Sequence, residues 1–287
     1  MPSGLLEDKN KKISGVIFGL LVLNIFFWQI ILFPSADNLK IYFLNVGQGD
    51  SQLVILPGKV KILIDGGPDN SVIEHLDKIF PFYQRYLDLV ISTHPQKDHL
   101  SGLVEVLRRR KVGLFISNGE KSSIAAYQEL ENLLKNSQLS RITLKASDKI
   151  KYGSSSLKIL WPPKGFVSQK PNDLVLVSLL ESAGVKVLFT SDISTKQEES
   201  LIKDFDLDLD ILKVAHHGSK FSTSWDFLQK TRPEIAVIEV GKNSYGHPTK
   251  EVLNRLASIG AKILRTDELG DIKLEIKEGK IYLSYSR

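Results

Sequence analysis

The chain has 287 residues, of which 42% are hydrophobic and 25% are charged, a composition that is ordinary for a folded globular protein. It contains no cysteine, which excludes disulfides and thiolate metal ligands. Any metal site must therefore use histidine, aspartate, glutamate and carbonyl groups. The net charge of +5 would help an anionic substrate to approach, but it is too small to identify a nucleic-acid-binding protein.

The N-terminal region contains an uncharged, strongly apolar run over residues 13–33. A helix of this length spans roughly 30 Å, which matches the hydrocarbon core of a membrane. A cleaved signal peptide is the alternative, but its apolar core is usually only ~7–15 residues long. Lys9, Lys11 and Lys12 precede the run and indicate that the N-terminus stays in the cytoplasm. We therefore expect a single-pass protein of the cell membrane, with a cytoplasmic tail over 1–12, a transmembrane helix over 13–33, a linker over 34–38 and an extracytoplasmic domain over 39–287.

In that domain, short β-type runs alternate with amphipathic helical stretches. The predicted strands cover residues 39–46, 51–56, 61–64, 87–92, 113–117, 141–145, 156–161, 174–180, 186–190, 211–214, 235–240, 262–265, 271–276 and 280–285. The predicted helices cover residues 71–80, 102–109, 122–134, 195–205, 224–231 and 249–259. So many strands with helices between them favour layered sheets covered by helices, an α+β fold.

The strand predicted over 87–92 is followed directly by Thr93-His94-Pro95-Gln96-Lys97-Asp98-His99. Two imidazoles and a carboxylate within six residues are good ligands for a divalent cation, and the end of a strand holds them in place. This segment therefore predicts a metal site.

Four further segments present polar side chains where predicted strands end. An isolated aspartate there is more often a turn residue, but together with the histidine motif these segments favour a common site. His75 has no partner motif and is expected to be an ordinary structural histidine. The candidate side chains are Asp65, Asp192, His216, His217, Ser219, Asn243, Tyr245 and His247.

The collinear set of motifs resembles the metallo-β-lactamase superfamily, in its competence DNA-uptake branch represented by the soluble domain of ComEC. The resemblance begins at Asn45-Val46-Gly47-Gln48-Gly49-Asp50-Ser51 and covers residues ~39–285. It implies a four-layer αββα sandwich with the site at one edge between the two sheets.

The resemblance also implies roles for the candidate residues. Asp98, His99, Asp192 and one of His216 and His217 would bind one ion of Zn²⁺ or Mn²⁺. Spacing does not separate the two neighbouring histidines, of which we favour His216. His94 would bind a second ion with Asp192 as the bridge, and Asp65 would orient the imidazoles from behind.

One position departs from the family's pattern. The usual third ligand of the motif is histidine or aspartate, whereas here it is Gln96, whose amide is a weaker ligand. The second ion is therefore expected to bind weakly.

The expected activity is metal-dependent hydrolysis of a phosphodiester. In this mechanism Asp98 or Asp192 takes the proton of the attacking water, and His247 stabilises the leaving oxygen. Ser219, Asn243 and Tyr245 are expected to hydrogen-bond the phosphate, and Lys97, Lys213, Lys220 and Lys242 could attract a polyanion.

Three functions stay open at this point. The first is a membrane-anchored phosphodiesterase or nuclease that acts on DNA, with a membrane channel as the candidate partner. The second is a cell-surface esterase of phosphorylated envelope polymers. The third is a non-catalytic binding module that has lost one metal position at Gln96. The oligomeric state cannot be predicted from the sequence.

Overall fold

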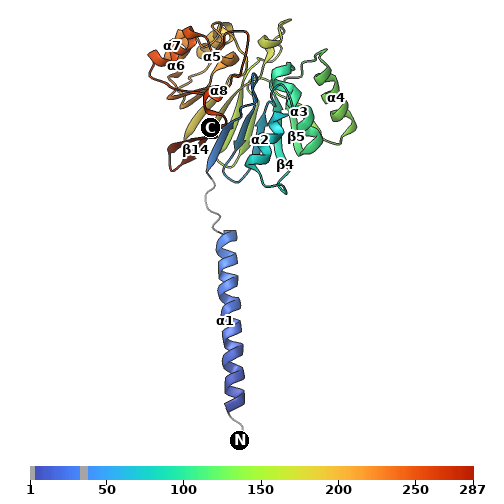
Figure 1. Ribbon diagram of the computed structural model, residues 1–287, viewed down its shortest axis with the longest axis vertical. Coiled ribbons are helices and arrows are strands. Elements are labelled where there is room, and N and C mark those ends of the chain that lie inside the picture. The colour runs from blue at the N-terminus through green and yellow to red at the C-terminus, as the bar shows by residue number, and fades with distance from the viewer. Residues whose placement is uncertain (1–3, 33–37) are drawn as a thin grey trace. The chain divides into compact units, whose positions relative to one another are not determined.

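The structure is a computed structural model that describes residues 4–32 and 38–287 (Figure 1). Residues 4–32 form one helix, α1 (Gly4–Leu32), which begins before the start of the helix expected over 13–33. Among the described residues, no helix is both long and apolar enough to cross a membrane. Within α1 the structure describes the side chains of residues 14–28 only, whereas the predicted span covers 13–33. The span therefore stays a prediction. Most of the predicted linker over 34–38 also lies outside the described residues.

Residues Asn38–Arg287 form one compact unit that contains two mixed β-sheets. The first sheet has the strand order β15-β14-β1-β2-β3-β4-β5-β6. Neighbours from β3 to β6 pair in parallel, and the other pairs are antiparallel. The strands are β1 (Leu39–Phe43), β2 (Gln52–Ile55), β3 (Lys61–Ile64), β4 (Tyr86–Ser92), β5 (Lys111–Ser117), β6 (Ser140–Thr143), β14 (Ile272–Lys277) and β15 (Lys280–Tyr285).

The second sheet has the strand order β13-β12-β11-β10-β9-β8-β7. Neighbours from β10 to β13 pair in parallel, and the other pairs are antiparallel. The strands are β7 (Lys149–Tyr152), β8 (Ser155–Trp161), β9 (Val177–Ser182), β10 (Val185–Phe189), β11 (Ile211–Lys213), β12 (Ile235–Ile238) and β13 (Lys262–Arg265).

The apolar side chains fall into three clusters that define four layers. One cluster lies between the sheets and joins residues such as Ile41 and Ile62 of the first sheet to Val187 and Val237 of the second. The other two clusters lie on the outer faces, where each sheet packs against amphipathic helices (Figure 1). The first sheet is covered by α2 (Ser71–Ile79), α3 (Lys97–Arg109) and α4 (Ala125–Asn136), and the second by α5 (Thr195–Asp204), α6 (Trp225–Thr231) and α7 (Lys250–Ser258).

The bounds of several elements differ from the expectation by a few residues. Helix α3 begins at Lys97 rather than at 102, so Asp98 and His99 lie in its first turn instead of in a loop. Position 102 lies inside this helix and must be glycine, because a Cβ atom there would lie 1.9 Å from the carbonyl oxygen of Gly66. Strand β7 was not predicted because it is only four residues long and mostly exposed, and α4 begins at Ala125 rather than at 122.

Two further pieces of local structure were not predicted and matter for the site. A one-turn 3₁₀ helix, η1 (Pro171–Leu174), precedes β9, and another, η2 (Ala215–Gly218), follows β11. A short helix, α8 (Thr266–Leu269), which was also not predicted, connects β13 to β14. His75 is an ordinary structural residue, as expected, since its Nδ1 pairs with Asp271 at 2.8 Å.

Candidate metal centre

The candidate residues meet where parallel strands of the two sheets end. In the first sheet, β3 leads into Asp65, and β4 leads into Thr93, His94 and helix α3. In the second sheet, β10 leads into Asp192, and β11 leads into η2. Because adjacent parallel strands end at the same sheet edge, side chains distant in sequence become neighbours here.

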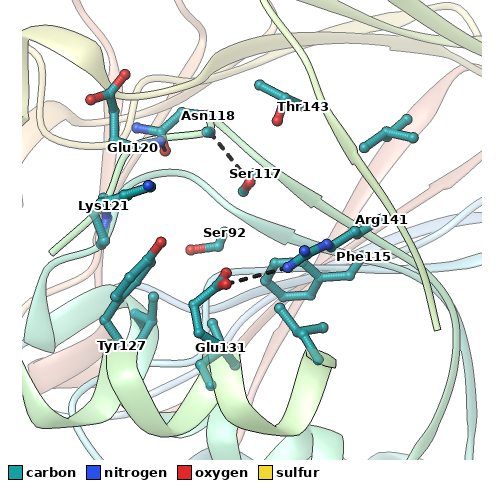
Figure 2. A pocket seen from close by; sticks show the side chains of 16 residues that line it. Ser92, Phe115, Ser117, Asn118, Glu120, Lys121, Tyr127, Glu131, Arg141 and Thr143 are labelled. Atoms are coloured by element: carbon teal, nitrogen blue, oxygen red, sulfur yellow. Dashed lines mark hydrogen bonds and ion pairs between the residues drawn. The ribbon is translucent and has the colours of Figure 1, made fainter. Parts of the chain in front are cut away.

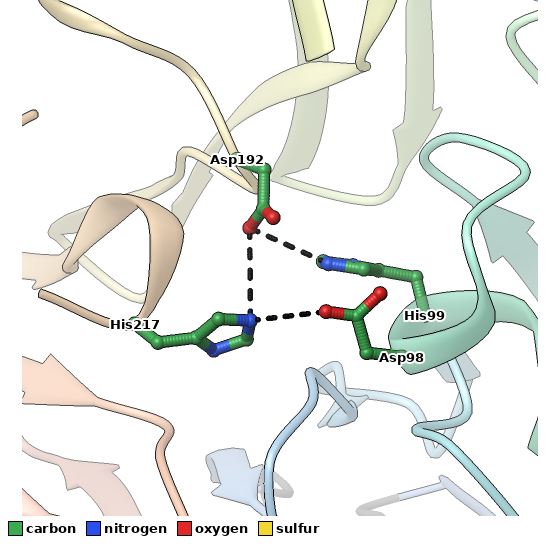
Figure 3. A group of neighbouring side chains, drawn as sticks. All are labelled: Asp98, His99, Asp192 and His217. Carbon is green, nitrogen blue, oxygen red and sulfur yellow. Dashed lines mark ion pairs between the residues drawn. The ribbon is translucent and has the colours of Figure 1, made fainter. Parts of the chain in front are cut away.

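Four side chains form a group that could hold a metal ion: Asp98, His99, Asp192 and His217 (Figure 3). Their ligand atoms all lie within 4.8 Å of one another. His99 Nε2 is 3.4 Å from Asp192 Oδ1, and His217 Nε2 is 3.5 Å from Asp98 Oδ2. Two imidazoles and two carboxylates are a chemically sound set for Zn²⁺ or Mn²⁺.

The inward-facing atoms of this group lack hydrogen bonds. His99 Nε2, His217 Nε2 and Asp192 Oδ1 are buried and have no hydrogen-bond partner in the described part of the chain. Buried polar atoms are normally satisfied, so three of them facing one point indicate a place for a cation. The residues present therefore fit a divalent metal.

The opposite ring nitrogens of both histidines are held in place. His99 Nδ1 lies 2.8 Å from Asp65 Oδ2, and His217 Nδ1 donates to the backbone oxygen of Glu239 at 2.8 Å. Such bonds fix the ring orientation and leave Nε2 free to bind a metal. Asp65 thus contacts the ring of His99, in the position needed to orient this imidazole toward a metal.

The pKa values in the group reflect its mixture of buried charges. Burial would raise the pKa of Asp192, but the neighbouring His99 and His217 hold it well below its ordinary value. Burial also opposes ionisation of Asp98, yet the neighbouring His217, whose Nε2 lies 3.5 Å from Asp98 Oδ2, and the charge of His99 lower its pKa to about 2. Burial would lower the pKa of His99, but Asp192 and Asp50 raise it well above the ordinary value. A metal must therefore displace a proton from an imidazole, and its affinity should fall as the pH falls.

His94 is fully buried but stands outside the four-residue group. The Thr93 hydroxyl donates to Asp65 at 2.6 Å, so it accepts from His94 Nδ1 at 3.1 Å and leaves His94 Nε2 with a free lone pair. Burial and the neighbouring His99 lower the pKa of His94 to about 3, so its ring is neutral. Gln96 donates its amide N–H to the Asn172 side chain of η1. The His94 side of the centre thus has one imidazole and uncharged amides, and a weakly bound second ion there stays a prediction.

The two adjacent histidines take different positions. Both have a left-handed backbone, with φ of 50° at His216 and 53° at His217, and their rings lie at 71° to each other. His217 enters the four-residue group, whereas the half-exposed His216 has its Nε2 3.7 Å from the outer oxygen of Asp192. The geometry therefore favours His217 over His216, the histidine preferred from the sequence, and which of the two binds a metal stays a prediction.

A cavity of about 400 Å³ opens beside the group. Asp98 and Asp192 face it together with the two rings of His216 and His247, whose centroids are 5.8 Å apart. Burial and His216 lower the pKa of His247, so this ring is neutral at pH 7 and can offer an N–H but carries no charge. The remaining lining residues are Gln48, Pro68, Gln96, Lys97, His217 and Tyr245.

Two residues expected to bind phosphate do not face this cavity. Ser219 is buried, and its hydroxyl accepts from the backbone of Phe221. Both the oxygen and the nitrogen of the Asn243 amide form hydrogen bonds within its own loop, to backbone atoms of Gly241, Tyr245 and His247. Both side chains shape the loops of the centre, and of the three predicted phosphate contacts only Tyr245 lines the cavity.

A buried charge network behind the centre was missed at the sequence level. Lys213 is fully buried and pairs with Asp50, whose Oδ1 lies 3.3 Å from His217 Nδ1. Lys213 is therefore no surface attractor of polyanions. Glu239, also fully buried, accepts from the backbone N–H of Ser51 at 2.9 Å, and burial together with Asp50 raises its pKa to about 8. Two features of the sequence could have indicated these residues. Glu239 is a charged residue inside the apolar run 235–240, and Asp50 directly follows a glycine-rich turn.

A second cavity, of about 350 Å³, lies between β5, β6 and α4 (Figure 2). Three of its four charged lining residues are paired, since Arg141 contacts Glu131 at 3.3 Å and Glu120 contacts Lys145 at 3.8 Å. No cluster of potential metal ligands among the described residues lies in its wall. The first cavity is therefore the better candidate for a metal site.

Residues 60–217 match the family described as "Beta-lactamase superfamily domain", which is more than half of the chain. The chain belongs to the metallo-β-lactamase superfamily. This confirms the family resemblance predicted from the motifs. Its fold is shared with solved members, for example the metallo-beta-lactamase fold protein YhfI from Bacillus subtilis, with a TM-score of 0.59 at 12% identity, covering 83% of this chain and all of that one.

Within this superfamily the chain is distantly related to competence proteins. It is 28% identical over 257 residues to ComE operon protein 3 of Bacillus subtilis (strain 168), covering 83% of this chain and 33% of that protein. It is 26% identical over 292 residues to Recombination protein 2 of Haemophilus influenzae, covering 99% of this chain and 34% of that protein. The chain thus spans about a third of the length of these relatives.

Proposed function

We propose that this protein is a metal-dependent phosphodiesterase whose centre is formed by Asp98, His99, Asp192 and His217. The observation that carries the proposal is the convergence of these four side chains, with ligand atoms within 4.8 Å and three inward atoms unpartnered. A divalent ion bound there would act as a Lewis acid and lower the pKa of water from ~15.7 toward ~7. The metal could be zinc or manganese, because both accept a mixed set of imidazoles and carboxylates.

The side chains around the cavity supply the remaining functions. Asp98 is partly exposed and ionised at neutral pH, so it can accept a proton from an attacking water. His247 can donate its ring N–H to the leaving oxygen as a neutral imidazole. Lys97 at the cavity wall would attract the phosphate charge.

The proposed substrate is DNA or another phosphodiester. The relationship to competence and recombination proteins supports DNA, although the chain spans only about a third of those relatives. A phosphorylated envelope polymer is the alternative, because it offers the same phosphodiester chemistry without bases. A non-catalytic binding module is less well supported, because it would not need the metal-binding group of Asp98, His99, Asp192 and His217.

The proposed location is the outer face of the cell membrane, with residues 13–33 as the anchor. The uncharged run and the lysines at 9, 11 and 12 support this orientation. DNA reaching the domain from outside could then be passed to a separate membrane channel partner.

The test uses the full chain purified in mild detergent, stripped of metal with a chelator and reloaded with Zn²⁺ or Mn²⁺. The loaded protein should cleave single-stranded DNA, and the stripped protein and the D192A variant should not. Cleavage of a glycerol-phosphate polymer but not of DNA would favour the envelope polymer. A loaded protein that cleaves no phosphodiester would contradict the proposal.

A further inference from the structure

Tyr245 lies at the mouth of the catalytic cavity and is 73% exposed. It lines the same cavity as Asp98, Asp192 and His216. The hydrogen bond that the structure gives Tyr245 is made by its backbone N–H, so the ring itself is free to contact a ligand.

The loop that carries this ring is firmly braced. Asn243 Oδ1 accepts from the backbone N–H groups of Tyr245 and His247, both at 3.1 Å. Asn243 Nδ2 donates to the carbonyls of Gly241 at 2.9 Å and His247 at 2.8 Å. One amide thus closes the whole loop, and little conformational entropy remains to be lost when a ligand binds.

The loop also fixes the ring relative to the reaction site. The Tyr245 ring lies 5.8 Å from the His247 ring at an interplanar angle of 31°, and His247 in turn lies next to His216. The outer face of the tyrosine is therefore a flat apolar platform one ring away from the imidazoles that face the scissile bond.

A flat platform beside a phosphate site has a specific chemical match. Nucleic acids carry a planar base next to every phosphodiester, whereas glycerol-phosphate and sugar-phosphate polymers carry no planar ring. An exposed aromatic ring binds an unpaired base by stacking, with little dependence on sequence. A base inside a duplex is already stacked on its neighbours and is not available.

We propose that Tyr245 determines the substrate class of this site by stacking on an unpaired base next to the scissile phosphate of a single-stranded nucleic acid. The role expected from the sequence, a hydrogen bond from its hydroxyl to the phosphate, is replaced by a contact of the ring. This inference rests on the proposed phosphodiesterase activity and narrows its substrate.

The test compares two single strands of equal length, an oligothymidylate and an abasic strand, as substrates of the metal-loaded full chain. Y245A should raise the KM for the oligothymidylate roughly 5- to 150-fold, the range expected for the loss of one stacked base, with a smaller change in kcat. With the abasic strand the ratio of variant to wild-type KM should fall to about one. Y245F, which keeps the ring and removes the hydroxyl, should behave like the wild type on both strands.

Phe82 provides the matched control. Its ring is 81% exposed, and it precedes the amino end of β4, whereas the metal centre follows the carboxyl end of that strand. F82A should therefore leave both KM values unchanged. A loss in F82A equal to that in Y245A would contradict the inference, because exposed rings would then act without regard to position.

The outcomes separate the inference from the activity on which it rests. Equal effects of Y245A on both strands, no effect on either, or a loss in Y245F as large as in Y245A would overturn the stacking role while leaving the phosphodiesterase intact. A wild type that cleaves neither strand but cleaves a glycerol-phosphate polymer would overturn the inference and leave a phosphodiesterase of another substrate. A wild type that cleaves none of the three would contradict the phosphodiesterase itself.

Discussion

His216 and His217 are neighbours in the chain, yet the structure gives their side chains different surroundings. The ring of His217 is buried, with its Nδ1 bound to a carbonyl and its Nε2 facing Asp98. The ring of His216 lines the cavity, with its Nε2 3.7 Å from Asp192 Oδ2. Two consecutive left-handed residues turn the chain so sharply that adjacent side chains diverge.

This difference predicts unequal effects of two adjacent alanine substitutions. H217A removes one of four ligands and should weaken Zn²⁺ binding by at least about 100-fold, since even the loss of an outer supporting residue costs roughly 10–100-fold. H216A is the matched control and should change the affinity by less than about fivefold. Competition with a chromophoric chelator measures both, and the reverse order would show that His216 is the ligand.

Glu239 gives a prediction on the pH dependence of stability. Its pKa in the folded chain is raised to about 8 by burial and by Asp50, from an ordinary value of 4.5. Because the folded chain then holds a proton that the unfolded chain releases, stability is full below about pH 4.5 and is lost as the pH rises toward 8. E239Q removes this loss, so the stability of E239Q relative to the metal-free wild type should increase from pH 5 to pH 8. Urea unfolding at both pH values measures this, and a difference that does not change with pH would contradict the assignment.

Lys213 and Asp50 are expected to be coupled energetically. K213M leaves a buried carboxylate without its partner and should destabilise the metal-free protein by about 3–5 kcal/mol. In the double variant K213M/D50N both charges are gone, so its loss of stability should be smaller than the sum of the two single losses by at least ~1 kcal/mol. Strictly additive losses in urea unfolding would show that the pair does not interact.

At the scale of elements, helix α3 brings two of the four ligands to the centre. Its first turn carries Asp98 and His99, and its axis is set by the close contact of Gly102 with the loop after β3. The same loop carries Asp65, so the helix and the residue that orients His99 are held together.

This contact predicts that Gly102 tolerates no side chain. A Cβ atom would lie 1.9 Å from the oxygen of Gly66 and 2.5 Å from the oxygen of Asp69, both of which are backbone atoms. G102A should therefore destabilise the protein by about 1–3 kcal/mol or more and lower its melting temperature. S101A, on the same helix, is the control and should have little effect; equal melting temperatures for G102A and the wild type would contradict the packing described.

The sequence was most informative where chemistry and local pattern coincide. The His94–His99 motif, Asp65 and Asp192 follow predicted strands, and the structure brings all three segments to one edge. What could not be predicted depends on tertiary contacts. Neither His216 nor His217 is distinguished by spacing, the burial of Lys213 depends on Asp50 far along the chain, and Asn243 binds its own loop rather than a ligand.

At the scale of the whole molecule, each of the two sheets positions two of the four side chains of the centre. The first sheet supplies Asp98 and His99 through β4 and α3, and the second supplies Asp192 and His217 through β10 and β11. A metal held between them would bind the folded chain and not the unfolded one, so it should also stabilise the packing of the sheets.

The metal content of the full chain tests this account most directly. After exposure to Zn²⁺ or Mn²⁺ and removal of free ions by gel filtration, elemental analysis of the wild type should find about one ion per chain, and D192A should retain almost none. A folded wild type without a bound ion, or a D192A variant that retains as much metal as the wild type, would contradict the metal centre.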